Sequence, residues 1–139
     1  MPRRAFFAAP LVLALLAACG GADQPAPPPV VTCGTTANSG TLGVGDQPTC
    51  GTATFPTVNS YSFSTGSAAI YSVTVWTTSG DADFCVTGPA FYQCSSNTPP
   101  SWVDRVSFTG AASTAYTVDV ENWAFNASYS TYAIQVTSP

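Results

Sequence analysis

The stretch AIYSVTVWTT, Ala69–Thr78, decides the fold because apolar and polar side chains alternate along it. In an extended chain, Tyr71, Val73 and Val75 fall on one face, and residues 72, 74 and 76 fall on the other. A period of two over this length is typical of a half-buried β-strand. The turn residues Ser79–Asp81 then end the strand.

Other stretches of the chain show the same alternation, and Gly, Pro and Asn lie in the breaks between them. The further predicted strands are Asn59–Thr65, Ala82–Thr87, Trp102–Phe108, Ala115–Trp123 and Thr131–Thr137. From Cys33 on, no stretch has a convincing helical period. Several short strands joined by turns predict an all-β fold, a single antiparallel β-sandwich.

The alternation also predicts which side chains form the core. The inward set is Tyr61, Phe63, Tyr71, Val73, Val75, Phe84, Val86, Trp102, Val106, Phe108, Tyr116, Val118, Val120, Tyr132, Ile134 and Val136. These residues are plentiful enough for about 105 residues to bury one core.

The N-terminal residues 1–18 have the pattern of a secretory signal, with Arg3 and Arg4 followed by an apolar run. The run is too short to span a bilayer core of about 30 Å. Its end, Leu16-Ala17-Ala18-Cys19, resembles the lipobox of bacterial lipoproteins, and this resemblance implies that Cys19 carries lipid, including palmitate. The alternative is an ordinary signal peptide in which Cys19 is incidental.

Residues 19–32 are expected to be a tether, because Pro25, Pro27, Pro28 and Pro29 favour extended, non-globular chain. The folded domain is then expected over 33–139. The lipoprotein resemblance implies a membrane partner reached through the lipid on Cys19. Gly20, rather than Asp, follows the lipidated position, which favours the outer membrane, in either periplasmic or surface orientation.

Four further cysteines, Cys33, Cys50, Cys85 and Cys94, are an even number in a chain expected to be exported. This predicts two disulfides. Three pairings are open, and proximity in sequence favours Cys33–Cys50 and Cys85–Cys94. A zinc site is disfavoured because the chain has no His and no CxxC spacing.

Without residues 1–18 the chain keeps one basic residue, Arg105, against seven acidic ones. The acidic residues are Asp23, Asp46, Asp81, Asp83, Asp104, Asp119 and Glu121. Nucleic acids and other polyanions are therefore excluded as partners, since their phosphates need basic side chains.

The residues also argue against an enzyme. There is no His for a catalytic triad, and no Cys of the domain is free if the four pair. Asp119 and Glu121 share an outward strand face, where carboxylates are more often solvated than placed across a cleft. We predict no catalytic residues and no cofactor.

Asp81 and Asp83 leave two alternatives open. They are expected first as turn caps that bond to nearby backbone. The other alternative is calcium, with Asp104, Asp119 or Glu121 completing the shell. An EF-hand is excluded because Cys85 and Val86 stand where its loop needs an acidic residue and Gly. No metal is predicted.

Outward aromatic residues form the candidate ligand surface. They are Trp76, Tyr92, Trp123 and Tyr129, with Phe91 nearby. Exposed aromatic platforms mark interaction sites for glycans or proteins. The alternative is that these rings cover the edge of the sandwich.

Much of residues 40–138 resembles the bacterial pre-peptidase C-terminal domain. The matching motifs are Asn59–Phe63, Tyr71–Val75, Gly80-Asp81-Ala82-Asp83-Phe84-Cys85-Val86, Tyr116–Val120 and Ser130–Val136. The resemblance implies a jelly-roll-like sandwich that serves secretion, stability or substrate attachment, although these 139 residues contain no peptidase. We therefore expect a non-enzymatic envelope module for adhesion or substrate attachment, which binds a glycan or a protein. The alternative is a structural or assembly lipoprotein without a small ligand.

Overall fold

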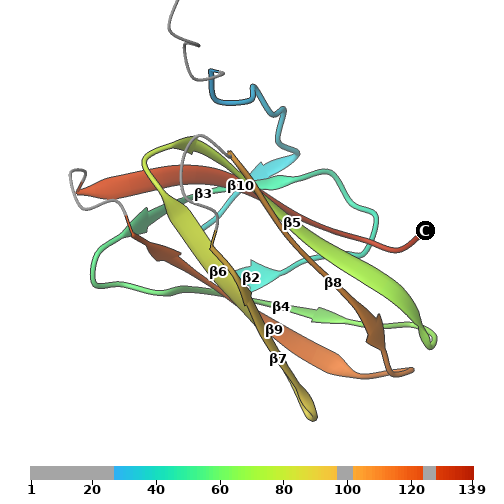
Figure 1. The fold of residues 1–139 in the computed structure, drawn as a ribbon. Helices are drawn as coiled ribbons and strands as arrows, with labels where there is room; N and C mark the ends of the chain where they lie inside the picture. Colours follow the sequence, from blue (N-terminus) through green and yellow to red (C-terminus); the bar gives the residue numbers. More distant parts are fainter. Residues whose placement is uncertain (1–26, 97–101, 124–127) are drawn as a thin grey trace, which may run out of the picture.

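Two five-stranded sheets pack face to face in the computed structural model, which describes residues 27–96, 102–123 and 128–139 (Figure 1). The first sheet has the order β1-β3-β10-β5-β8, and the second has the order β2-β4-β9-β6-β7. The strands are β1 (Thr35–Thr36), β2 (Gly40–Thr41), β3 (Thr49–Thr54), β4 (Asn59–Ser64), β5 (Ala69–Ser79), β6 (Ala82–Gly88), β7 (Phe91–Ser95), β8 (Val103–Gly110), β9 (Ala115–Asn122) and β10 (Tyr129–Thr137). The predicted all-β sandwich is confirmed.

All long strands pair antiparallel, whereas the two-residue strands β1 and β2 pair parallel to β3 and β4. The described residues contain no helix that is long and apolar enough to cross a membrane. The predicted signal peptide, Cys19 and the tether up to residue 26 lie outside the described residues.

The inner faces of the two sheets form one core. Every residue of the predicted inward set is buried except Trp102, which is half-buried. At one end the core is aromatic: Phe63 stacks on Tyr116 at 5.4 Å between ring centroids, and Phe91 stacks on Phe108 at 4.5 Å. Phe91 therefore packs against the core, as the edge-packing alternative predicted.

Four strands, β1, β2, β3 and β7, lie outside the strands that the sequence predicts. The sequence of β3, TCGTAT, offers no large apolar side chain to mark a period of two. It pairs along β10 instead, where Gly51 leaves room for the Tyr132 ring; a Cβ at Gly51 would lie 2.5 Å from the Tyr132 hydroxyl. Strand β7 is a short sheet edge that depends on its pairing with β6.

The predicted disulfide pairs are both present. Cys33 bonds to Cys50, which joins the start of the domain to β3. Cys85 bonds to Cys94 across β6 and β7, where the two residues lie directly opposite each other. The second bond lies on the outer face of its sheet, since the neighbouring residues Phe84 and Val86 point into the core.

Candidate functional site

A groove of about 440 Å³ lies on the outer side of the sheet β2-β4-β9-β6-β7. Strands β6, β7 and β9 line it, together with the residues that follow β7 and β9. Its residues are Asp83, Phe84, Cys85, Tyr92, Cys94, Ser95, Ser96, Asp119, Glu121 and Trp123. We call it the acidic–aromatic groove, because its lining combines carboxylates with two exposed rings and contains no basic side chain.

The carboxylates meet because of strand register. Asp83 on β6 lies directly opposite Glu121 on β9, and Asp119 lies opposite Cys85. Like charges in directly opposite positions destabilise a sheet. Asp119 has a partner, since the Ser60 hydroxyl donates a hydrogen bond to its Oδ1 at 2.6 Å.

The pKa of Asp83 is raised to about 7, first by partial burial and then by the charges of Asp81, Asp104 and Glu121. Burial and Asp104 also raise the pKa of Asp81. Both effects penalise the ionised carboxylate. A ligand that brings positive charge or hydrogen-bond donors to Asp83 would relieve this penalty.

Asp104, on the other sheet, contacts the groove residue Ser95. It lies on the same face of β8 as Val106 and Phe108, so its carboxylate turns inward and is buried. The Ser95 hydroxyl donates a hydrogen bond to Asp104 Oδ1 at 2.8 Å, which links β7 to β8 beside the groove. An inward charge on an edge strand such as β8 also discourages pairing with another chain.

The two aromatic residues of the groove are well exposed, with Tyr92 at 70% and Trp123 at 50%. The Tyr92 hydroxyl lies 3.2 Å from Sγ of Cys94 and 3.5 Å from Sγ of Cys85. The disulfide therefore lies beside Tyr92. The backbone N–H of Trp123 donates to the Asp81 carbonyl at 2.8 Å, which ties the end of β9 to the β5–β6 turn.

Ser130, from the first sheet, holds this β5–β6 turn in place. Its hydroxyl accepts a hydrogen bond from the Asp81 N–H at 2.8 Å and lies 2.5 Å from Asn122 Oδ1. Gly80 has a φ of 80°, and a Cβ there would lie 2.4 Å from the Ser130 hydroxyl. The close contact explains why the turn needs glycine.

The geometry around Asp81 and Asp83 bears on both alternatives, a turn cap and a calcium site. Within the part of the chain that the structure describes, no hydrogen bond to either side-chain carboxylate occurs, so side-chain caps do not explain these residues. Within the same part, no group of three or more His, Cys, Asp or Glu side chains could hold a metal ion.

The predicted ligand surface is divided between the two sheets. Tyr92 and Trp123 line the acidic–aromatic groove, but Trp76 and Tyr129 do not. Trp76 is half-buried on the outer side of the other sheet, between Ala133 and Val103. Tyr129 begins β10, where it pairs with Thr54.

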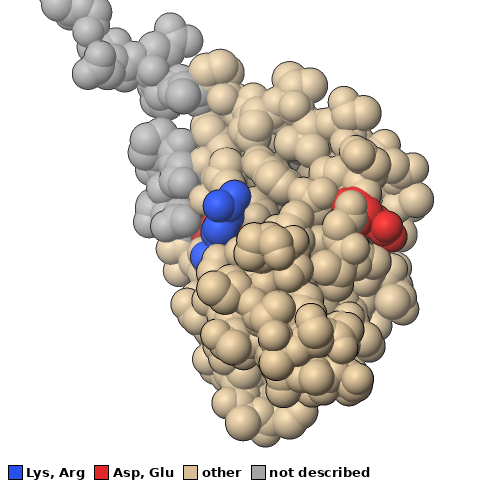
Figure 2. All heavy atoms as spheres, turned by 90° about the vertical axis from the view of Figure 1, so that its right-hand side faces the viewer, with Lys and Arg blue, Asp and Glu red and all other residues tan. Residues whose placement is uncertain are grey.

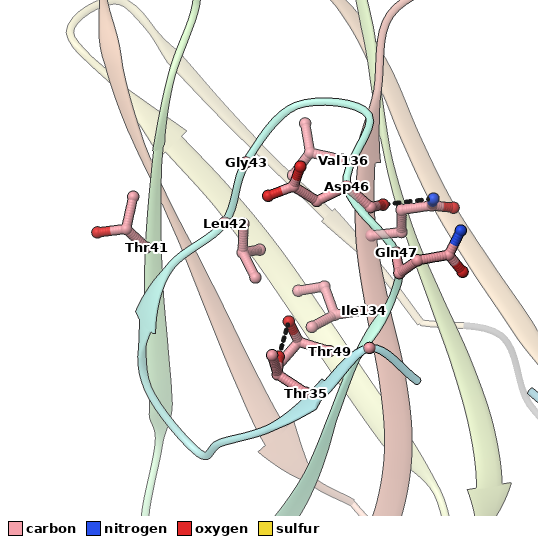
Figure 3. A pocket seen from close by; sticks show the side chains of 11 residues that line it. Thr35, Thr41, Leu42, Gly43, Asp46, Gln47, Thr49, Ile134 and Val136 are labelled. Atoms are coloured by element: carbon pink, nitrogen blue, oxygen red, sulfur yellow. Dashed lines mark hydrogen bonds between the residues drawn. The ribbon is translucent and has the colours of Figure 1, made fainter. Parts of the chain in front are cut away.

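Sequence analysis missed a second hollow, of about 310 Å³, beside the loop between β2 and β3 (Figure 3). Leu42, Ile134 and Val136 line it together with the hydroxyls of Thr35 and Thr49, which lie 3.1 Å apart. Gln135 donates its Nε2 hydrogen to the Asp46 carbonyl at 2.8 Å and fastens the loop. The hollow has few charges, and charged atoms are also sparse on the face of the molecule drawn in Figure 2.

Comparison with known proteins supports the fold. Solved structures with this fold include the pre-peptidase C-terminal domain of a collagenase from Bacillus anthracis, at 14% identity and a TM-score of 0.57, covering 70% of this chain and 93% of that one. PliG from Salmonella Typhimurium, a periplasmic lysozyme inhibitor of g-type lysozyme, matches at 14% identity and a TM-score of 0.51, covering 74% of this chain and 100% of that one. A PliG mutant from Escherichia coli has the same identity and coverages and a TM-score of 0.50.

No protein-family profile and no curated protein sequence matches the chain. At 14% identity the structural neighbours show the fold alone. The sandwich expected from the resemblance to the pre-peptidase C-terminal domain is therefore confirmed as a fold.

Proposed function

We propose that this chain is a lipid-anchored binding module of the bacterial envelope, and that it holds its ligand in the acidic–aromatic groove. The observation that carries the proposal is the exposure of Tyr92 and Trp123 in one groove with Asp83 and Glu121. Large exposed rings beside convergent polar groups are typical of binding surfaces. Adhesion or attachment to a glycan or protein of the envelope is the role that this surface serves.

Binding fits the groove better than catalysis does. The carboxylates of Asp83 and Glu121 lie side by side on neighbouring strands. A glycosidase instead places two carboxylates on opposite sides of the scissile bond. The sequence has no His to act as a base at neutral pH.

The structural neighbours are compatible with this role. PliG is by name a periplasmic inhibitor of g-type lysozyme, so the same fold serves in protein recognition in another bacterial envelope. The other neighbour is, by its description, the pre-peptidase C-terminal domain of a collagenase.

The test is a pull-down of envelope proteins and polysaccharides with the mature chain, comparing matched variants. Tyr92→Ala combined with Trp123→Ala should abolish retention of the ligand, because both rings are removed from the groove. Tyr129→Ala is the control, since it removes an aromatic ring of similar exposure outside the groove. Equal retention by all three proteins would contradict the proposal and favour a structural lipoprotein without a small ligand.

A further inference from the structure

The acidic–aromatic groove carries an inference that rests on the proposed function and names the class of its ligand. We infer that the groove binds a protein segment that presents an arginine or lysine side chain. The cation would lie against the Asp83–Glu121 pair, with its stem or plane against Tyr92 or Trp123. The inference stands on charge, on strand register and on the exposed rings.

The distribution of charge favours a cationic ligand. Asp83, Asp119 and Glu121 all line the groove, and no basic residue does. Arg105 is the only basic residue in the described part of the chain, and its Nε donates to Thr74 Oγ1 at 3.1 Å on the outer side of the other sheet. The groove therefore has no basic side chain of its own to neutralise its carboxylates.

A ligand that covers this groove also removes water from the carboxylates. Covering an ionised carboxylate without a compensating charge costs several kcal/mol. A neutral sugar would offer hydroxyl donors but would leave Asp83 and Glu121 as an unneutralised pair. A guanidinium group supplies several N–H donors and one positive charge to the same two carboxylates.

Strand register gives the pair a suitable geometry. Asp83 and Glu121 are directly opposite across β6 and β9, and Cβ atoms in such positions lie about 4.5–5.5 Å apart. A planar guanidinium can bridge two neighbouring carboxylates and still stack on an aromatic ring. Tyr92 and Trp123, which line the same groove, supply exposed rings for this contact.

The experiment uses the full-length protein in a non-ionic detergent and a fluorescent glycine–serine peptide that carries arginines. The matched probe is the same peptide with citrulline in place of arginine, which keeps the shape and removes the charge. Neutral chitin oligosaccharides and their deacetylated, cationic counterparts are titrated in parallel. Asp83→Asn and Glu121→Gln test the groove, and Asp46→Asn, in the loop bonded to Gln135 and Val136, is the charge-matched control.

We expect the arginine peptide to bind and the citrulline peptide to bind about tenfold more weakly or not at all. Each groove variant should weaken binding of the arginine peptide by about three- to tenfold, and Asp46→Asn should leave the affinity unchanged. We expect Asp83→Asn to fold, because the substitution removes a negative charge that is repelled by Asp81, Asp104 and Glu121. A loss of binding by this variant therefore reports on the groove. Binding should also tighten from about pH 6 to pH 8, because Asp83 then loses its proton.

Several results would overturn the inference. Equal binding of the citrulline peptide, or unchanged binding by both groove variants, would remove the role of the cation. Binding of either chitin probe but not of the peptide would make the ligand a glycan. If these outcomes occur while Tyr92→Ala with Trp123→Ala still abolishes retention of envelope ligand, the proposed function stands and only the ligand class is wrong. If the double variant retains that ligand, the proposed function and the inferred ligand class are both wrong.

Discussion

At the scale of single residues, Asp83 shows how strand register places a carboxylate where its ionised form is disfavoured. Its side chain is partly buried on the outer face of a sheet, opposite Glu121. Asp81 and Asp104 add two further negative charges from the turn and from β8. The arrangement disfavours the free protein with Asp83 ionised, and the contact that we infer with a cation would remove the penalty.

Asp83→Asn should therefore stabilise the protein at neutral and higher pH. The pKa of Asp83 is about 7 in the folded protein against 3.8 ordinarily, so the folded state binds its proton more tightly than the unfolded state does. Stability contributed by this group is present below about pH 4 and is lost as pH rises to 7. Because Asp83 is only partly buried, solvent screens part of the repulsion, and we expect Asp83→Asn to raise the free energy of unfolding by about 1–2 kcal/mol at pH 8.

The measurement is a series of melting curves between about pH 4 and pH 8. The Tm of the wild type should fall relative to that of Asp83→Asn as pH rises, whereas Asp46→Asn should follow the wild type. A constant difference in Tm between Asp83→Asn and the wild type across this range would contradict the account.

Gly80→Ala should destabilise the β5–β6 turn. The residue has a positive φ, and a new Cβ would lie within 2.9 Å of the Ser130 backbone and still closer to its hydroxyl. We expect a loss of about 1–3 kcal/mol, measured by denaturant unfolding. Gly66→Ala is the control, because the added Cβ would contact nothing within 4 Å and φ there is not positive. Equal stability of the two variants would show that the turn relaxes freely.

At the scale of strands, alternation was sufficient wherever large apolar residues occupy every second position. This holds for β5 and β9, whose inward faces carry Tyr71, Val73, Val75 and Tyr116, Val118, Val120. It fails for β3, where small side chains and Gly51 fill the inward positions because Tyr132 needs the space. A local pattern does not contain such a contact between distant residues.

The acidic–aromatic groove was predictable only in part for the same reason. Tyr92 and Trp123 were identified as outward rings, but their meeting with Asp83 depends on the order of β7, β6 and β9 in the sheet. The inward direction of Asp104 follows from the parity of β8, and this signal was present in the sequence beside Val106 and Phe108. Its hydrogen bond with Ser95 could not be read from the sequence, because it joins two sheets.

Strand β7 should depend on its disulfide for its contribution to the groove. Cys85→Ser with Cys94→Ser removes the bond between β6 and β7, and we expect a loss of at most about 2–4 kcal/mol. Phe91 should keep β7 partly in place through its stack on Phe108. Ligand retention should fall more than global stability does, since Tyr92 lies against the two sulfurs. Thermal melting and the pull-down measure the two effects, and unchanged retention would contradict this role.

At the scale of the whole molecule, a sandwich with few charges carries Asp83, Asp119 and Glu121 on one outer face and its single described base, Arg105, on the other. This asymmetry gives the domain one face suited to a cationic partner. The predicted lipid on Cys19 and the tether up to residue 32 would keep that face near the envelope.

Cys19→Ala should abolish membrane anchoring and leave the domain folded, because the substitution lies before the tether. Fractionation of cells into membrane and soluble material measures anchoring, and circular dichroism of the released chain measures folding. A variant that stays in the membrane fraction at the wild-type level would contradict the lipoprotein prediction.

The central claim is that the acidic–aromatic groove is where this protein binds its ligand. The most direct measurement is amide hydrogen exchange of the full-length protein with and without the envelope material that it retains. The account predicts new protection in β6, β7 and the end of β9, around Asp83, Tyr92 and Trp123. Protection confined to the outer side of β5 around Trp76, or to the loop around Leu42, would contradict it.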